Sequence, residues 1–185
     1  MDRRLFLFGL VPLAVGCAPP ARLVLMPAPQ SDLSVRPIIG SLMVRDVDLP
    51  SYAGSVEVVF LDEAGILQST GLLWADAPDR AIRFGLVEAL GAITGARVAA
   101  EPWPFSQRPA AELTVRVSLL TARPGGTLDL AGHYAIAPVA SDLADRSGRF
   151  DISVPVAAEE AASIGAAQSA AIAALAETIA ERLSR

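Results

Sequence analysis

Residues 113–121 read LTVRVSLLT, in which apolar leucine and valine alternate with polar threonine, arginine and serine. This alternation is typical of a β-strand that buries one face and exposes the other. The turn sequence Pro124-Gly125-Gly126 leads into a second apolar stretch, Leu128–Ile136, and Phe150–Val156 alternates in the same way. The three segments predict an antiparallel meander with exposed polar faces.

Four more strands are predicted upstream of the meander. They are rich in β-branched residues, and two of them flank the turn signal Glu63-Ala64-Gly65. The predicted strands are Ile38–Val47, Val56–Leu61, Ile66–Trp74 and the short Arg97–Ala100.

A helix is predicted between the third and the fourth of these strands. Apolar residues recur there at four- and three-residue spacing, which places them on one face of a helix. These residues are Ile82, Leu86, Leu90 and Ile93. Asp76 is predicted to cap the start of the helix, Pro78 is tolerated in the first turn, and Gly95 is predicted to end it.

A second, alanine-rich helix is predicted over Glu159–Arg185, where an acidic start and an arginine-bearing end suit the helix dipole. Its section Ala161–Ala176 carries no charged residue, so a membrane-spanning segment is the alternative. Gln168 interrupts this section, which is shorter than about 20 residues, and alanine drives membrane insertion weakly. We therefore favour burial against the sheet.

Together these elements predict an α+β fold. The expected architecture is a mostly antiparallel sheet with two main helices packed on one face. A single domain is predicted over residues 32–185.

The N-terminus has the features of a secretion signal that ends before a cysteine. Arg3 and Arg4 precede the apolar run Leu5–Val15, which at about 11 residues is roughly half the length of a membrane span. Gly16-Cys17 then completes a sequence similar to a bacterial lipobox, whose cysteine is acylated. We predict that residues 1–16 are a removed signal peptide and that Cys17 is lipidated. An ordinary signal with an incidental cysteine is the alternative.

Residues 17–31 are predicted to be the lipidated cysteine and a proline-rich tether, which contains the strand-like patch Leu23–Met26. Ala18, rather than an aspartate, follows the cysteine. By analogy with the enteric sorting rule, this favours an anchor in the outer membrane, with the domain facing the periplasm.

Composition excludes several classes of partner. Removal of the signal takes away Asp2, Arg3 and Arg4, which leaves 13 basic and 19 acidic residues among 169. This negative balance, without a basic run, argues against nucleic acid. Since Cys17 is the only cysteine, its lipidation excludes disulfides and thiolate metal sites. No cofactor and no metal site are predicted.

Catalysis finds little support in the sequence. His133 is the only histidine and lies in a predicted strand. The carboxylate pairs Asp142 and Asp145, and Glu159 and Glu160, stand next to predicted loops or helix starts, where solvation or capping accounts for them. No nucleophile elbow, phosphate-binding loop or metal-spaced histidine pair is present. We predict no enzymatic activity, with a small periplasmic hydrolase as the rival hypothesis.

The few aromatic residues supply candidate contacts for a partner or a lipid. Trp103 and Phe105 lie in a proline-stiffened segment, for which an interface and core packing are both open. Trp74 stands at a strand-to-helix junction, where we favour a core plug over a ligand contact. The full set of candidates is Leu49, Pro50, Tyr52, Trp74, Trp103 and Phe105.

These motifs resemble those of the ABC-type transport auxiliary lipoproteins, the family of paraquat-inducible protein C. The family's Leu-Pro-x-Tyr segment looks like Leu49-Pro50-Ser51-Tyr52, and its Trp-Ala-acidic helix start looks like Trp74-Ala75-Asp76. Pro102-Trp103 and the alanine-rich Leu175–Ala180 are also similar. The family's Leu-Asp-Arg-Pro is replaced here by Ala53-Gly54-Ser55-Val56, which puts any contact made by that segment in doubt.

The resemblance implies a non-enzymatic role beside an ABC transporter complex with an MCE-type substrate-binding subunit, which moves lipids between the inner and outer membranes. The lipoprotein would be its docking component on the outer-membrane side, with a homo-oligomer as one option. The alternative is a structural lipoprotein that assists outer-membrane assembly without a transporter. An adjacent ATPase, permease and MCE gene would favour transport.

Overall fold

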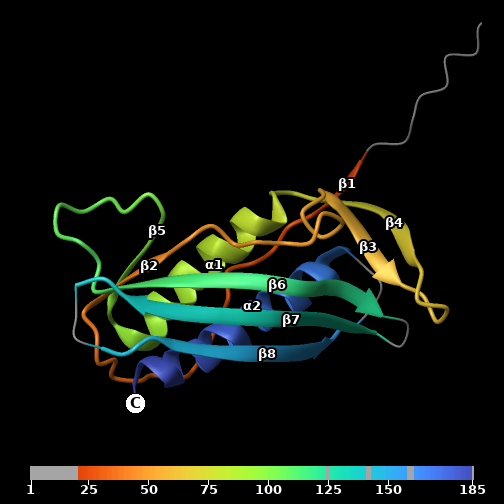
Figure 1. Ribbon diagram of the computed structural model, residues 1–185. Coiled ribbons are helices and arrows are strands. Elements are labelled where there is room, and N and C mark those ends of the chain that lie inside the picture. Colours follow the sequence, from red (N-terminus) through yellow and green to blue (C-terminus); the bar gives the residue numbers. More distant parts are fainter. Residues whose placement is uncertain (1–20, 124–125, 141–142, 158–160, 185) are drawn as a thin grey trace, which may run out of the picture.

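The predicted meander is the longest part of the sheet (Figure 1). It consists of β6 (Ala111–Arg123), β7 (Thr127–Pro138) and β8 (Arg146–Pro155), which pair antiparallel in chain order. In β6 the side chains of Leu113 and Val115 are fully buried, whereas Arg116 is exposed. Thr114, Arg116 and Ser118 face solvent, as the sequence predicts, whereas Thr121, which lies beyond a register shift after Val117, is buried.

The computed structural model describes residues 21–123, 126–140, 143–157 and 161–184. The predicted signal peptide and Cys17 lie outside the described residues. So do Ala18, Pro124, Gly125, Asp142, Glu159 and Glu160, which are also named above.

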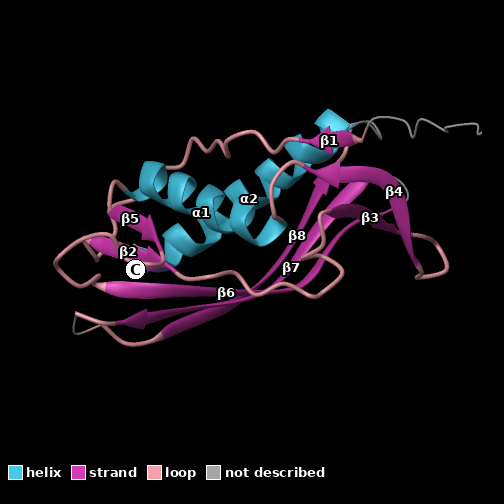
Figure 2. Ribbon diagram, turned by 90° about the horizontal axis from the view of Figure 1, so that it is seen from above, coloured by secondary structure: helices cyan, strands magenta, loops and turns pink. Residues whose placement is uncertain are grey.

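The sheet is mixed and curled, so the expectation of a mostly antiparallel sheet is wrong (Figure 2). The other strands are β1 (Arg22–Val24), β2 (Ser41–Val44), β3 (Glu57–Leu61), β4 (Leu67–Trp74) and β5 (Arg97–Ala100). Four pairs of described strands are parallel: β1 with β4, β2 with β5, β2 with β6, and β3 with β6. Only the β3–β4 hairpin and the two meander pairs are antiparallel.

The parallel pairs join strands that are distant in the chain. Strand β2 lies between β5 and β6, with the first helix in the connection from β2 to β5. Alternating side chains reveal that a segment is a strand, but they do not reveal its partner. Short turns identify hairpins, whereas a parallel neighbour requires a long crossover that leaves no local signal.

Both helices lie together on one side of the curled sheet (Figure 2). Helix α1 (Pro78–Thr94) buries the whole predicted apolar stripe, and Gly95 ends it in the left-handed conformation with φ 66°. The predicted cap by Asp76 is wrong, because the N-cap residue is Ala77 and makes no side-chain capping bond. The Asp76 carboxylate instead accepts from the Ala77 N–H at 2.9 Å and pairs with Arg80 at 3.0 Å.

Helix α2 (Ala161–Leu183) is the one described helix that is long and apolar enough to span a membrane by composition. Most of it is inside the molecule, since 61% of its most apolar window is buried. Ala171, Leu175 and Ile179 have no exposed surface. Its small side chains let it pack closely against α1 and against strands β7 and β8, as the sequence predicts.

The N-terminal segment packs across both helices. Its residues Val24–Pro29, which we call the strap, pass close to a glycine on each helix. A Cβ on Gly165 of α2 would lie 2.2 Å from the Leu25 carbonyl oxygen, and one on Gly85 of α1 would lie 3.2 Å from Pro29 Cγ. Much of the segment predicted as a tether is thus held against the domain, and strand β1 within it pairs with β4.

Candidate functional site

Two of the predicted contact residues, Trp103 and Phe105, contact each other in the loop that follows β5. Their rings are edge-to-face, with centroids 4.9 Å apart. The Trp103 indole N–H donates to the Gln107 carbonyl at 2.6 Å, and the Arg97 guanidinium lies 5.0 Å from the centroid of the Phe105 ring. These contacts fix an aromatic surface before any partner arrives. We call Trp103 and Phe105, together with Arg97, the aromatic loop.

The aromatic loop is not part of the core. Phe105 is 43% exposed and Trp103 is half-buried, and neither packs on the buried cluster between sheet and helices. The rings therefore do not have the core position that was one of the two interpretations, and a contact with a partner or a lipid stays a prediction. Figures 1 and 2 both show this loop at the end of the molecule opposite β1.

The segment of Leu49, Pro50 and Tyr52 forms a turn that packs on the sheet. The Pro50 carbonyl accepts from the N–H groups of Ala53 and of the next residue, both at 2.9 Å. Leu49 and Tyr52 pack against the core, and the Tyr52 hydroxyl accepts from the Leu120 N–H at 3.4 Å. This geometry gives the segment a structural role in the free protein.

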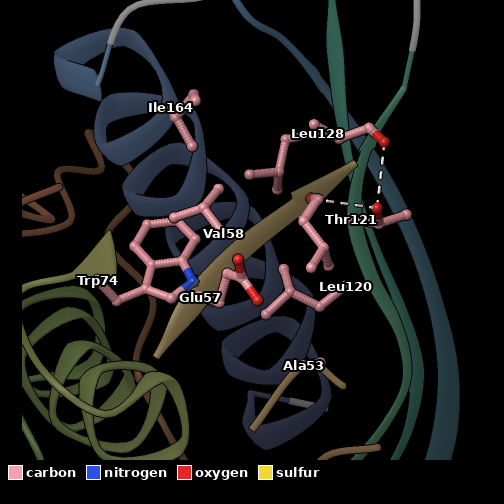
Figure 3. Close-up of a pocket in the computed structure, with 10 residues that line it drawn as sticks. Ala53, Glu57, Val58, Trp74, Leu120, Thr121, Leu128 and Ile164 are labelled. Carbon is pink, nitrogen blue, oxygen red and sulfur yellow. Dashed lines mark hydrogen bonds between the residues drawn. The ribbon is translucent and has the colours of Figure 1, made fainter. Parts of the chain in front are cut away.

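Trp74 lies at the end of β4, far from the aromatic loop. It is half-buried, and its backbone N–H donates to the Val56 carbonyl at 2.6 Å. Figure 3 shows its indole beside Val58 in a crevice that also includes Leu120 and Ile164. The crevice has about 20 Å³ of free space, close to the volume that one water needs. It is a packing gap, and the position of Trp74 supports the core-plug interpretation.

Trp74 also lines a larger groove, which lies between the strap and helix α1. Its volume is about 250 Å³. Gln168 of α2 is part of its wall, and this side chain is only 1% exposed. Neither its Oε1 nor its Nε2 atom has a hydrogen-bond partner in the part of the chain that the structure describes.

The sequence alone does not predict this groove. In the sequence, Gln168 interrupts an apolar helix, and Phe84 stands outside the apolar stripe of α1. A polar residue inside an uncharged run was the available signal. Gln168 becomes part of a groove wall only because the strap crosses both helices, and no local sequence pattern indicates this crossing.

The described residues show no arrangement suited to general acid–base or metal chemistry. His133 lies on the exposed face of β7 and accepts from Arg149 Nε at 2.9 Å. In the described part of the chain, no group of three His, Cys, Asp or Glu side chains could hold a metal ion. The backbone N–H of Ile66 and the side chain of Gln68 lower the pKa of Asp62, an effect of the β3–β4 turn.

Comparisons with known proteins agree with this fold. A family model for the ABC-type transport auxiliary lipoprotein component matches residues 23–180. A crystal structure of an uncharacterized protein is similar with a TM-score of 0.72 and 19% identity, over 89% of this chain and 99% of that chain. The structure of protein XCC0632 from Xanthomonas campestris, of family DUF330, is similar with a TM-score of 0.65 and 16% identity, over 89% and 95%. No curated protein sequence matches.

Proposed function

We propose, from the premise that this chain belongs to the ABC-type transport auxiliary lipoprotein family, that it docks an MCE-type ABC transport system at the outer membrane. The family match over residues 23–180 carries the proposal, because it spans all of α1, all but the last three residues of α2, and every described strand except the first residue of β1. The transported substrate is a lipid moving between the two membranes. In this role Cys17 holds the acyl anchor, and the protein contributes contacts rather than chemistry.

Anchoring makes modest contacts sufficient. A protein held at the membrane meets its partner at a high effective concentration, so a small docking surface can keep the two together. Residue 22 begins β1, so the chain between Cys17 and the domain spans at most roughly 17 Å. The domain therefore stays near the membrane while the partner approaches from the periplasm.

The aromatic loop is the surface that we assign to docking. It lies at the end of the molecule opposite β1, and thus opposite the end from which the chain leads to Cys17 (Figure 1). For a contact with the anchoring membrane, the aromatic loop would have to lie near the β1 end. Tryptophan, arginine and other aromatic residues are enriched where protein partners meet, and pre-ordered rings lose little entropy on binding.

A photo-crosslinking residue at Phe105 tests the assignment in intact cells. We expect it to capture the MCE subunit, because the ring would be covered by that subunit. The matched control is the same crosslinker at Ile66, which is 57% exposed in the β3–β4 turn away from the aromatic loop. Capture of an outer-membrane assembly protein instead would favour the structural alternative, and capture of a second copy would assign the loop to a homo-oligomer.

Trp103→Ala is expected to weaken capture from Phe105 about tenfold, since truncation of an aromatic anchor removes both its contacts and the support for its neighbour. Crosslinking yields at Phe105 and at Ile66 provide the measurement. The thermal stability of the variant should change little, because Trp103 does not pack on the core. Unchanged capture by a folded variant would contradict docking through this loop.

A further inference from the structure

The side-chain amide of Gln168 is buried in helix α2 without a hydrogen-bond partner among the described residues. Buried side-chain amides nearly always have partners, because desolvated donors and acceptors without them are costly. Among the described residues neither the NH2 group nor the oxygen of this amide has a partner, and Gln168 belongs to the wall of a groove of about 250 Å³. The NH2 donor and the oxygen acceptor lie side by side and are covered, so a ligand reaches them only if a neighbouring side chain moves.

Apart from two carboxylate residues, Asp76 and Glu88, the rest of the groove lining is mostly apolar, and the groove is large enough for a ring. Its walls come from the strap, from Trp74 and from the first half of α1, including Ala81 and Phe84. A dry cavity of about 150 Å³ is known to accept benzene, so this groove has room for a substituted ring. Phe84 is 46% exposed and Leu25 is 73% exposed, so the apolar surface continues out of the groove.

We propose that this groove binds a tyrosine side chain presented by a protein partner. A phenol hydroxyl can donate to Gln168 Oε1 and accept from Nε2, which satisfies both atoms at once. The ring would fill the apolar walls formed by the strap and Trp74. Met26, an unbranched side chain in the same wall, can shift to let the hydroxyl reach the amide.

Lipid and anionic ligands fit this groove less well. The charged residues that line it, Asp76 and Glu88, are both carboxylates, so a phosphate headgroup would be repelled. An acyl chain would leave the Gln168 amide unpaired. A free phenol is too small to cover the exposed apolar rim at Leu25 and Phe84 as well as fill the groove. A polypeptide that carries the tyrosine is large enough to do both. The inference rests on the proposed function only for the identity of that partner.

Two small probes test the hydrogen bonds on the full-length purified protein. We expect p-cresol to bind more tightly than toluene by about tenfold, measured by ligand-observed NMR, although toluene is the more hydrophobic probe. Gln168→Met, which keeps the length of the side chain and removes the amide, should abolish that preference while toluene still binds. Equal affinities of the wild-type protein for the two probes would overturn the proposal.

A second variant keeps the test informative if Gln168→Met does not fold. Ala81→Leu, on the α1 wall, fills the groove without touching the amide and should abolish binding of both probes. The variant suits a helix, because leucine is a good helix former. Unchanged p-cresol binding by folded Ala81→Leu protein would place the probe elsewhere and refute the site.

Short peptides distinguish a protein ligand from a free phenol. An acetylated Lys-Tyr-Lys amide should bind at least tenfold more tightly than its Lys-Phe-Lys analogue, and lose this advantage in Gln168→Met. Binding of p-cresol without binding of the tyrosine peptide would overturn the polypeptide assignment. If the probes and peptides do not bind as expected, the tyrosine site is refuted, but the crosslinking result at Phe105 is unaffected. If Phe105 does not crosslink to the MCE subunit, docking through the aromatic loop is refuted, but the tyrosine site is unaffected.

Discussion

Replacement of Cys17 by serine is expected to move the protein from the membrane fraction to the soluble periplasm, a change of more than tenfold in its distribution. Each methylene buried in the membrane contributes about 0.8 kcal/mol, so several acyl chains give an effectively permanent anchor. A serine hydroxyl cannot receive the chains through a thioether. Because α2 is mostly buried in the domain, it offers no second anchor.

Palmitate labelling followed by membrane fractionation measures this effect. The wild-type protein and the Cys17→Ser variant should each be expressed behind an ordinary secretory signal as well as behind their own. This arrangement ensures that an uncleaved Leu5–Val15 segment cannot act as a substitute anchor. Ala18→Ser is the matched control, because it introduces the same side chain one position later and should leave labelling intact. An unlabelled Cys17→Ser protein that still sediments with membranes from both signals would refute the anchor.

Much of the fold could be predicted because it depends on local patterns. The alternation in residues 113–121 identifies β6, and the stripe of Ile82 and Leu86 identifies α1. Gly95 marks the end of that helix, since only a residue that tolerates positive φ suits the position. In each case the signal and the structure that it specifies involve neighbours in the chain.

The features that could not be predicted depend on contacts between distant segments. Leu42 pairs in register with Val98 and with Ala111, and nothing in the residues around it indicates either partner. The same holds for the site. Trp103 and Phe105 can be grouped from the sequence because they are close in the chain, whereas Gln168 lines one groove with Leu25 and Phe84 only because the strap crosses both helices.

Replacement of Gly132 by alanine is expected to lower the free energy of unfolding by about 3 kcal/mol, the upper end of the usual cost of overpacking. Gly132 lies in β7, opposite a bulge that interrupts the register of β6 after Val117. A Cβ there would lie 2.2 Å from the Arg116 carbonyl oxygen and 2.9 Å from Val117 Cα, both backbone atoms, and 2.7 Å from the Phe150 ring. Side-chain rotation cannot relieve contacts with the backbone, so the β6–β7 pairing must shift.

Urea denaturation followed by circular dichroism measures this loss, and thermal unfolding should show a melting temperature lower by roughly 10 °C. Gly91→Ala is the matched control, because the same methyl group meets nothing within 4 Å there and lies inside α1. That variant should gain about 0.5–1 kcal/mol, since alanine restricts the unfolded chain and favours the helix. If both alanine variants unfolded at the wild-type urea concentration, the close approach of β6 and β7 at Gly132 would be refuted. The meander buries Leu113 and Val115 through this pairing, so its register determines which face of the sheet forms the core.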